Sequence, residues 1–363
     1  MPARRWICLA SLGALAGCTS IQRSLGIKTD LRHEPVIRVR GGLARGARPL
    51  CPGQTGPLVV VADLANGQSW STVGAPGGNV TWDSYGFSSP GATVDDHGNV
   101  TVSADPRQSR GGSVHLSVNV VGQAVGGGID VPVRYSCPEA AHFDGAKGGG
   151  GRLGDDGLPG APGAIGQPGG PGGPGQMGGP GRPGEPGDAV RVWVRLEPGA
   201  PRPLLQVMAQ SATHGGQVIY LIDPAGGSLT LTANGGRGGP GGLGGGGGPG
   251  GAGGPEASGA AAGAGGPGGD GGQGGAGGPG GVGGSFQVTV SPEAQPYLGA
   301  LRFVNAGGES GAGGGGGSYG AGGKGVIASG ASGHNGRRGQ SAPGRAPYGP
   351  RVTVTVHALP TLF

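Results

Sequence analysis

Short runs of alternating apolar and polar residues recur between residues 33 and 140. A period of two is typical of β-strands that bury one face, and clusters of Gly, Pro, Asn and Asp between the runs are typical of turns. Six or seven short strands with regular turns predict a β-sandwich over residues 33–140. The runs are Val36–Val39, Leu58–Ala62, Val80–Trp82, Val100–Val102, Val114–Val120 and Val131–Tyr135.

A second group of apolar runs lies within residues 190–363, where two long glycine-rich segments interrupt it. Similar runs stand on both sides of each segment, so each segment is expected to leave a β-sheet and return to it. The chain is therefore predicted to be all-β, with a sheet module at 190–363. The runs are Val190–Leu196, Leu204–Ala209, Gln217–Ile222, Ser228–Ala233, Phe286–Val290, Leu301–Val304 and Val352–Val356.

The glycine residues follow a period of three in three segments. In residues 141–189, Gly occupies every third position for 15 consecutive triplets, and eight of these triplets carry Pro in third place, which is a collagen-like pattern. Residues 235–285 hold 17 triplets in one phase: seven Gly-Gly-x, three interrupted, and seven Gly-Gly-x again. Residues 307–345 form a looser third segment.

A three-residue period corresponds to an extended, left-handed helix with three residues per turn. In a Gly-Gly-x tract two of the three columns lack side chains, so other backbones can approach and exchange hydrogen bonds there. We interpret the middle segment as two polyglycine-II helices joined by a turn, each spanning roughly 65 Å. A disordered low-complexity linker and a collagen-like homotrimer through residues 145–189 stay open as alternatives.

The triplet pattern resembles the glycine-helix bundles of some antifreeze proteins and phage tip adhesins. It is similar, more loosely, to the glycine-rich insert of the anaplastic-lymphoma receptor ectodomain. The resemblance implies a bundle of glycine helices and indicates no particular ligand.

The composition excludes some classes of protein. Of 363 residues, 96 are Gly and 33 are Pro, and the aromatic residues are only 4 Trp, 6 Tyr and 5 Phe. A single enzyme domain of this length needs a large aliphatic and aromatic core, which this chain cannot supply over its full length. The net charge is +5, but the basic residues are scattered, so nucleic acid is not an expected partner.

The first 17 residues resemble a bacterial lipoprotein signal peptide. Arg4 and Arg5 precede the apolar run Trp6–Ala16, which is too short to span a bilayer. Leu15-Ala16-Gly17-Cys18 resembles a lipobox, which implies cleavage before Cys18, lipidation of Cys18 and a tether over residues 18–32. The absence of Asp directly after Cys18 implies the outer membrane of a Gram-negative cell. The alternative is an ordinary signal peptide with a chance cysteine.

Residues 33–140 resemble a bacterial immunoglobulin-like module of surface proteins. The motifs that carry the resemblance are Pro52-Gly53-Gln54, the segment Val80-Thr81-Trp82-Asp83-Ser84 and the hairpin Val94–Val100. The sequence departs from this module in an insert at residues 85–90. We expect Trp82 to be a core residue rather than a platform for a ligand.

The positions of the four cysteines predict different roles for them. Cys8 leaves with the signal peptide and Cys18 carries lipid, so Cys51 and Cys137 remain. In an oxidising compartment this pair is expected to form a disulfide, which would tie an early strand of the module to its last one. Two free buried thiols are the alternative. Two cysteines without a histidine at ligand spacing do not predict a metal site.

The sequence contains no motif for catalysis, a metal or a cofactor. Gly322-Gly323-Lys324-Gly325 lacks the leading Gly and the Ser or Thr of a phosphate-binding loop. Asp95–Asn99 has ligand types that suit calcium, but a hairpin turn is the preferred interpretation. We therefore expect no enzyme activity. The seven histidines are far apart, at positions 33, 97, 115, 142, 214, 334 and 357.

Together these patterns predict a cell-envelope lipoprotein with a structural or adhesive role. The membrane is the expected partner through the N-terminal lipid, and a protein or polysaccharide surface is expected to meet the glycine helices. The chain is expected to be a monomer or a homotrimer. The alternatives are a collagen-like homotrimeric surface stalk and a polysaccharide- or ice-binding module. The irregular x column of residues 235–255, which has no Thr, weighs against ice binding.

Overall fold

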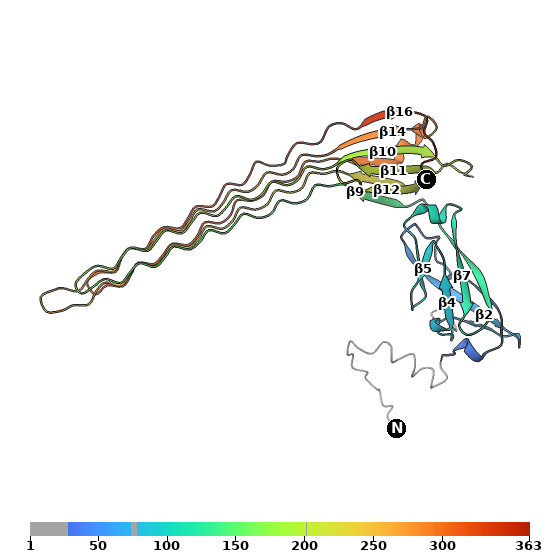
Figure 1. Ribbon diagram of the computed structural model, residues 1–363, viewed down its shortest axis with the longest axis horizontal. Helices are drawn as coiled ribbons and strands as arrows, with labels where there is room; N and C mark the ends of the chain where they lie inside the picture. The colour runs from blue at the N-terminus through green and yellow to red at the C-terminus, as the bar shows by residue number, and fades with distance from the viewer. Residues whose placement is uncertain (1–27, 74–77, 201) are drawn as a thin grey trace, which may run out of the picture. The chain divides into compact units, whose positions relative to one another are not determined.

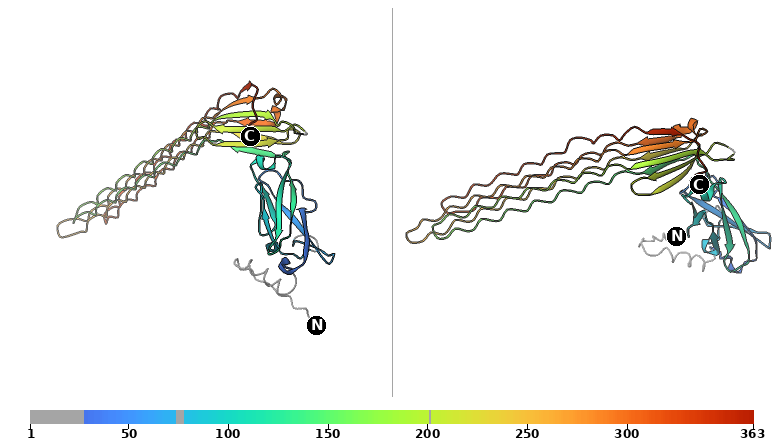
Figure 2. Two further views of the ribbon diagram at one scale, coloured as in Figure 1. Left: turned by 45° about the vertical axis from the view of Figure 1, so that its right-hand side comes forward. Right: turned by 45° about the horizontal axis from the view of Figure 1, so that its top comes forward.

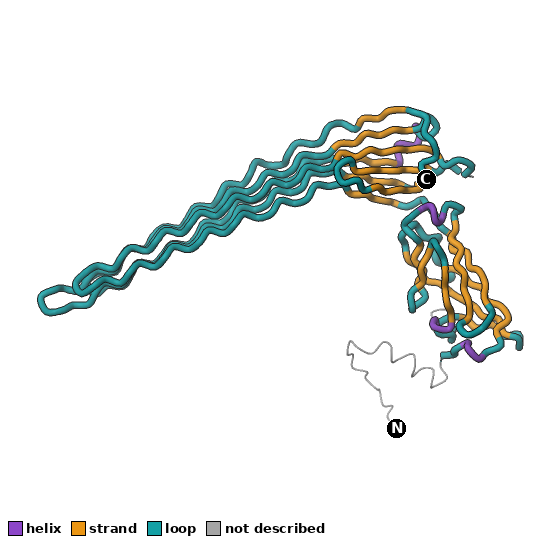
Figure 3. Tube along the Cα trace, viewed as in Figure 1, coloured by secondary structure: helices purple, strands orange, loops and turns teal. Residues whose placement is uncertain are grey.

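The computed structural model describes residues 28–73, 78–200 and 202–363. The predicted signal peptide and Cys18 lie outside these residues. The chain divides into two compact units. Unit 1 comprises residues up to Cys137 together with Ile219–Gly227 and Phe363, and unit 2 comprises Pro138–Val218 and Ser228–Leu362. Strands dominate the regular structure, which confirms the predicted all-β class (Figures 1 and 3).

Unit 1 is built from two antiparallel sheets. One has the order β1-β2-β6-β5, with β3 paired to β2, and the other has the order β4-β7-β8. The strands are β1 (Val36–Leu43), β2 (Thr55–Leu64), β3 (Ser69–Ser71), β4 (Tyr85–Ser88), β5 (Ala92–Val94), β6 (Asn99–Val102), β7 (Ser113–Val120) and β8 (Gly126–Pro132). Three short 3₁₀ helices are η1 (Leu31–His33), η2 (Trp82–Ser84) and η3 (Pro106–Ser109).

The core of unit 1 follows from the period of two. Strand β7 alternates strictly between exposed and buried residues, and Leu116 at its centre is fully buried. The two sheets meet closely, because a Cβ on Gly41 of β1 would lie only 2.7 Å from Cδ1 of Ile129 in β8. The apolar residue of each alternating pair is thereby removed from water, which is the dominant stabilising contribution to such a fold.

Three details of the predicted strands are wrong. Residues 80–82 form isolated bridges and the start of η2 rather than a strand. Residues 85–88, predicted as an insert, form β4. Strand β8 begins at Gly126, ahead of the predicted start at Val131, because three consecutive glycines carry no hydropathy pattern. Gly127 approaches the backbone of β1 so closely that a Cβ there would overlap the carbonyl oxygen of Val39.

The predicted disulfide between Cys51 and Cys137 is confirmed. Both residues are buried, at 2% exposure each, and they are 86 residues apart in the sequence. The bond joins the segment before β2 to the last residue of the N-terminal part of unit 1. A crosslink over so long a loop restricts the unfolded chain strongly.

Unit 2 contains the remaining strands, except that residues 219–222 of β12 belong to unit 1. A three-stranded parallel sheet has the order β15-β13-β9, and a five-stranded sheet has the order β12-β11-β10-β14-β16. The strands are β9 (Pro138–His142), β10 (Ala189–Leu196), β11 (Leu205–Ser211), β12 (Gln217–Ile222), β13 (Ser228–Thr232), β14 (Ser285–Val290), β15 (Leu301–Val304) and β16 (Thr353–Val356), with the 3₁₀ helix η4 at Gln295–Ala300.

Six extended glycine-rich arms connect these strands, and we number them in chain order. They run side by side away from the sheets and turn back at the far end (Figures 1 and 2). Arms 1, 3 and 5 leave β9, β13 and β15, whereas arms 2, 4 and 6 lead into β10, β14 and β16. The arms are residues 145–163, 169–187, 235–254, 263–284, 307–325 and 330–349.

Backbone hydrogen bonds between arms recur at every third residue. Gly148 N–H donates to the carbonyl of Arg237, and Gly151 N–H donates to that of Pro240, each at 2.8 Å. Arm 3 bonds in this way to arms 1, 2, 4 and 5, and arm 4 bonds to arms 2, 3, 5 and 6. Arms 1 and 6 each bond to only two neighbours among the described residues. The six arms therefore form two layers, one outgoing and one returning.

The number of glycine columns in an arm matches its number of neighbours. Arms 3 and 4, with four neighbours, have the Gly-Gly-x pattern, whereas arms 1 and 6 have one regular Gly per triplet. A Cβ on either column of arm 3 would overlap a backbone oxygen, for example that of Gly275 at Gly241 and that of Arg152 at Gly242. The sequence therefore encodes the place of each arm in the bundle.

The parallel sheets set the register of the arms. Strand β9 pairs in parallel with β13 from Pro138 to His142. At the end of this pairing Phe143 N–H donates to the carbonyl of Thr232, and the same hydrogen-bond offset continues in the arms from Gly148 to Arg237. The two sheets also contact each other, since the rings of Phe286 and Phe303 lie 5.2 Å apart. The glycine segments thus extend an alignment that a side-chain core has already fixed.

Side chains cap the open donors along one edge of the bundle. Three backbone N–H groups of arm 5 face arm 6 without a carbonyl partner. They donate to the side-chain oxygens of Ser341, Asn335 and Ser332, from Gly313, Tyr319 and Gly322 respectively. Side chains of arm 6 thereby satisfy donors of arm 5 that meet no carbonyl of that arm.

Replacing Cys51 and Cys137 together by Ser is expected to destabilise unit 1 by about 2–5 kcal/mol, because the unfolded chain regains the entropy of a long loop. Denaturant unfolding followed by tryptophan fluorescence measures the loss. Dithiothreitol should lower the stability of the unsubstituted protein to the same extent. An unchanged midpoint in the double variant would contradict the structural role of the bond.

Gly151→Ala is expected to destabilise the bundle strongly, because its Cβ would overlap the carbonyl oxygen of Gly179. Gly150→Ala is the matched control, since the nearest atom to its Cβ would be Cγ of Pro240 at 3.7 Å. We expect Gly150→Ala to leave the melting temperature of unit 2 unchanged or slightly raised, and Gly151→Ala to lower it. Thermal unfolding by circular dichroism tests this, and equal melting temperatures would exclude the close approach at Gly151.

Candidate binding surfaces

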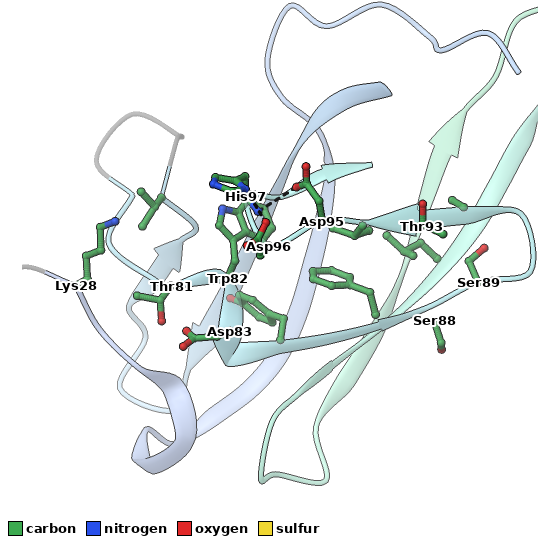
Figure 4. Close-up of a pocket in the computed structure, with 16 residues that line it drawn as sticks. Lys28, Thr81, Trp82, Asp83, Ser88, Ser89, Thr93, Asp95, Asp96 and His97 are labelled. Carbon is green, nitrogen blue, oxygen red and sulfur yellow. Dashed lines mark hydrogen bonds and ion pairs between the residues drawn. The ribbon is translucent and has the colours of Figure 1, made fainter. Parts of the chain in front are cut away.

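Unit 1 contains a cleft of about 1220 Å³ beside strands β4 and β5 (Figure 4). These two strands are edge strands of their respective sheets. Apolar side chains from the core reach the cleft, and a polar rim surrounds them. The apolar lining includes Phe87, Ala92, Val94 and Leu116, and the rim includes Lys28, Asp83, Ser88, Ser89, Thr93, Asp95, Asp96 and His97.

Trp82 lies among the residues that line this cleft, between Lys28 on one side and Ser88 on the other (Figure 4). We predicted a core position for it, but the side chain is only half-buried. Gly98 of the β5–β6 hairpin packs directly on the indole, because a Cβ there would overlap the benzene part of the ring. The ring centroid of Phe87 lies 6.2 Å away, at an angle of 44°. The hairpin therefore fixes the orientation of the indole, and part of its surface lines the cleft.

Tyr85 is buried beside the same cleft, with 6% exposure. Its ring lies 6.2 Å from that of Phe87. Within the described structure its hydroxyl has no hydrogen-bond partner, which is uncommon for a buried polar atom. Burial raises the pKa of this phenol far above its ordinary value, so the group stays protonated and can donate a hydrogen bond.

The segment Asp95–Asn99 is a hairpin turn, as predicted. One oxygen of Asp95 accepts from the backbone N–H groups of His97 at 3.0 Å and Asn99 at 2.7 Å, and the other accepts from the Asn99 amide at 2.9 Å. Gly98 takes a φ of 80°, which favours glycine. The hydrogen bonds from the Asn99 side chain and backbone lower the pKa of the Asp95 carboxyl.

Ligand atoms of Asp95, Asp96 and His97 lie within 4.8 Å of one another. All three side chains are exposed, and both oxygens of Asp95 are already engaged in holding the hairpin. The nitrogen Nδ1 of His97 lies 2.6 Å from a carboxylate oxygen of Asp96. These contacts account for the cluster as part of a turn, so it does not indicate a calcium site.

The arms present two faces built from their outward columns. On the outgoing layer, arms 1, 3 and 5 contribute neighbouring side chains. A Cβ at Gly246 would lie 3.3 Å from a carboxylate oxygen of Asp156 and 3.4 Å from the hydroxyl of Ser318. Large apolar residues stand exposed on this face, among them Leu153 at 63% and Leu243 at 55%.

The returning layer presents a column of proline. Arm 2 carries Pro171, Pro174, Met177, Pro180, Pro183 and Pro186 at every third position, and all six are exposed. Proline lacks a backbone N–H, and the third position of arm 2 donates no backbone hydrogen bond among the described residues. Proline therefore stands at positions where its missing N–H removes no hydrogen bond between arms.

Several histidines have acidic neighbours that the sequence spacing did not reveal. His115 lies 3.0 Å from Asp130, His214 lies 3.1 Å from Asp188, and His334 lies 3.1 Å from Asp270. Each pair joins residues from different strands, loops or arms, so no local motif predicts it.

The most enzyme-like of these groups is formed by Ser211, His214 and Asp188. The Ser211 hydroxyl donates to Asp188 Oδ2 at 2.7 Å, and the same oxygen lies 3.1 Å from His214 Nδ1. The Ser211 hydroxyl oxygen also accepts from the backbone N–H of Thr213 and His214. Serine and histidine both bond to the carboxylate, so histidine is not placed to take the proton of the serine hydroxyl. The group caps a turn.

The chain matches no protein-family model, no curated protein and no solved structure. Among the described residues, no helix has the length and apolar content needed to cross a membrane.

The aromatic cleft is the feature that the sequence patterns did not predict. The chain is poor in aromatic residues, but three of them, Trp82, Tyr85 and Phe87, lie in one stretch of six residues, and this was the one signal in the sequence.

The Asp95 carboxylate is expected to stabilise the hairpin in a pH-dependent way. Folding lowers the pKa of this carboxyl. Its contribution to the free energy of unfolding is therefore fully present above the ordinary Asp pKa of about 3.9, and it is lost as the pH falls through the lower pKa of the folded state. Asp95→Asn does not titrate, so the melting temperatures of the two proteins should converge as pH falls from 6 to 2.5.

Asp96→Asn is the matched control, because its carboxylate holds no backbone N–H of the hairpin among the described contacts. It should keep the pH dependence of the unsubstituted protein. A difference between the unsubstituted protein and Asp95→Asn that stayed constant down to pH 2.5 would exclude the proposed role of the Asp95 charge.

Proposed function

We propose that the protein is a lipid-anchored component of a bacterial cell envelope that uses its glycine-rich arms as a rigid structural or adhesive element. The observation that carries this proposal is the three-residue hydrogen-bond lattice between the arms. A laterally bonded bundle holds its outward side chains at fixed spacing, which a flexible linker cannot do. Fixed spacing favours contact with an extended surface.

The anchor is inferred from the N-terminal sequence. Leu15-Ala16-Gly17-Cys18 after a basic and apolar segment resembles a lipobox. Lipid chains on Cys18 would hold the protein at a membrane, by analogy in the outer membrane. The disulfide between Cys51 and Cys137 is compatible with export to an oxidising compartment.

We assign the arms as polyglycine-II helices. Their contacts fit that structure, since one arm meets up to four others through backbone hydrogen bonds of 2.7–3.3 Å and most residues in the contact columns are glycine. We assign the sheets of unit 1 to an immunoglobulin-like module. The alternating burial of β7 and the hairpin at Asp95 agree with the sequence resemblance on which this assignment rests.

The collagen-like homotrimer is disfavoured by the use of the glycine donors. In a collagen triple helix the Gly N–H groups donate to the other chains, and no larger residue fits at the axis. Here those of arms 1 and 2 donate to arms 3 and 4 of the same chain, for example from Gly157 to Gly246. This use of the donors favours a monomer.

A polysaccharide- or ice-binding role through the arm faces remains the second candidate. The proline column of arm 2 is regular and supports it, but the neighbouring column of arm 4 holds Asp270 and Gln273 as well as Pro267 and Ala276. A mixed column of this kind fits a chemically varied partner better than a uniform lattice.

Metabolic labelling with a palmitate analogue tests the anchor. The unsubstituted protein should incorporate the label and sediment with membranes, and Cys18→Ser should do neither. Light scattering in detergent, corrected for the micelle, should give the mass of one chain. Incorporation of the label by Cys18→Ser would exclude the lipobox assignment. The mass of three chains would exclude the monomeric bundle and favour the collagen-like homotrimer.

The adhesive role is tested on cells that display the protein. Met177→Glu with Pro180→Glu alters the returning face, and Leu153→Glu with Leu243→Glu alters the outgoing face; all four side chains are exposed, so the bundle should remain intact. One pair should reduce attachment of cells to a surface several-fold. Unchanged attachment by both pairs and by a chain lacking arms 3 and 4 would reject adhesion.

A further inference from the structure

We propose that the cleft of unit 1 is a binding site for a neutral saccharide. This site is separate from the arm faces, and the inference goes beyond the proposed function. Three features of the cleft support this assignment: a partly exposed aromatic surface, a buried phenol without a hydrogen-bond partner in the described structure, and an exposed rim with hydroxyl and carboxylate groups.

The aromatic surface comes first. Trp82 and Phe87 are both half-buried and line the cleft, with ring centroids 6.2 Å apart. Sugar rings carry an apolar face of C–H groups that packs on the negative face of an aromatic ring. Because Gly98 already supports the indole from the hairpin, Trp82 needs little reorganisation on binding, and this pre-organisation favours affinity.

The Tyr85 hydroxyl supplies a second argument. The residue is 6% exposed and lines the cleft, but its hydroxyl has no partner within the described structure. An unpaired buried hydroxyl is costly, so a ligand that offered an acceptor at this point would gain from satisfying it. A sugar hydroxyl accepts and donates at once, and therefore suits this position.

The rim determines the charge of the ligand. Ser88, Thr93 and Asp96 are exposed at the edge of the cleft (Figure 4). Hydroxyl and carboxylate oxygens accept hydrogen bonds from sugar hydroxyls. The rim carries one lysine, Lys28, against the three carboxylates of Asp83, Asp95 and Asp96, so its excess of negative charge disfavours acidic sugars. A neutral saccharide meets these conditions without placing an unpaired charge in the cleft.

An extended peptide is the competing ligand, because β4 and β5 are edge strands that can pair with an added strand. These strands have only four and three residues, which offers few backbone bonds. The aromatic and hydroxyl groups together favour the sugar.

The experiment uses the full chain in a detergent without a sugar headgroup. Isothermal titration calorimetry with cellohexaose, maltohexaose and hexa-N-acetylchitohexaose, all of them neutral, should give binding to at least one of them. The affinity should change less than twofold between 50 and 500 mM NaCl, because the ligand is neutral. The proposal would be overturned if none of the three sugars bound. It would also be overturned if only a peptide of alternating apolar residues bound.

Two variants localise the site. Trp82→Leu should weaken binding about tenfold or more by removing the ring contact, whereas Trp70→Leu, outside the cleft in the same unit, should not. Tyr85→Phe removes only the hydroxyl, so it should weaken binding several-fold while unit 1 keeps or gains thermal stability. Tyr348→Phe in unit 2 is its control. Full affinity in both Trp82→Leu and Tyr85→Phe would show that the sugar binds elsewhere.

Discussion

The absence of a β-carbon at the inner glycine positions is the constraint on which unit 2 depends. The arms exchange backbone hydrogen bonds of 2.7–3.3 Å in two directions at once. At that separation the carbonyl oxygen of a neighbouring arm occupies the place where a Cβ would stand, as at Gly241 and Gly242. A β-sheet avoids this conflict by pointing side chains out of its plane. A bundle with neighbours above, below and beside each arm has no free direction except the outward column.

Glycine makes this contact possible and also makes it hard to reach, because ordering glycine costs more backbone entropy than ordering any other residue. The parallel sheets offset part of that cost by aligning the arms before they meet. The registers of β9 with β13 and of β10 with β14 pass directly into the arms that follow or precede them. The buried aliphatic residues of these strands and the contact of Phe286 with Phe303 supply the side-chain core that the arms lack.

Sequence patterns predicted the parts of this structure that repeat. The period of two located most strands, and the interrupted triplets of residues 235–285 predicted an arm, a turn and a returning arm. They did not reveal that residues 141–189 also fold back, because the Gly-X-Y phase continues through the turn at 164–168. The cleft was not predicted either. It depends on how Trp82 packs against Gly98 and where β4 begins, and both are results of tertiary packing rather than of local pattern.

The two units differ in how far the side chains of their contact surfaces also stabilise the fold. In the bundle, the lattice uses mainly backbone groups and bare columns. An outward residue whose side chain makes no bond between arms, unlike Asn335 or Ser341, is therefore free to change without disturbing the lattice. Gly246, Pro249 and Ala252 occupy equivalent places for this reason. In unit 1, Tyr85 and Phe87 line the cleft and pack against each other near the core. A change of specificity there must preserve packing. A change on the arms need preserve only glycine and the side chains that bond between arms, such as Asn335 and Ser341. The contact surface of the arms can therefore vary more widely than that of the cleft.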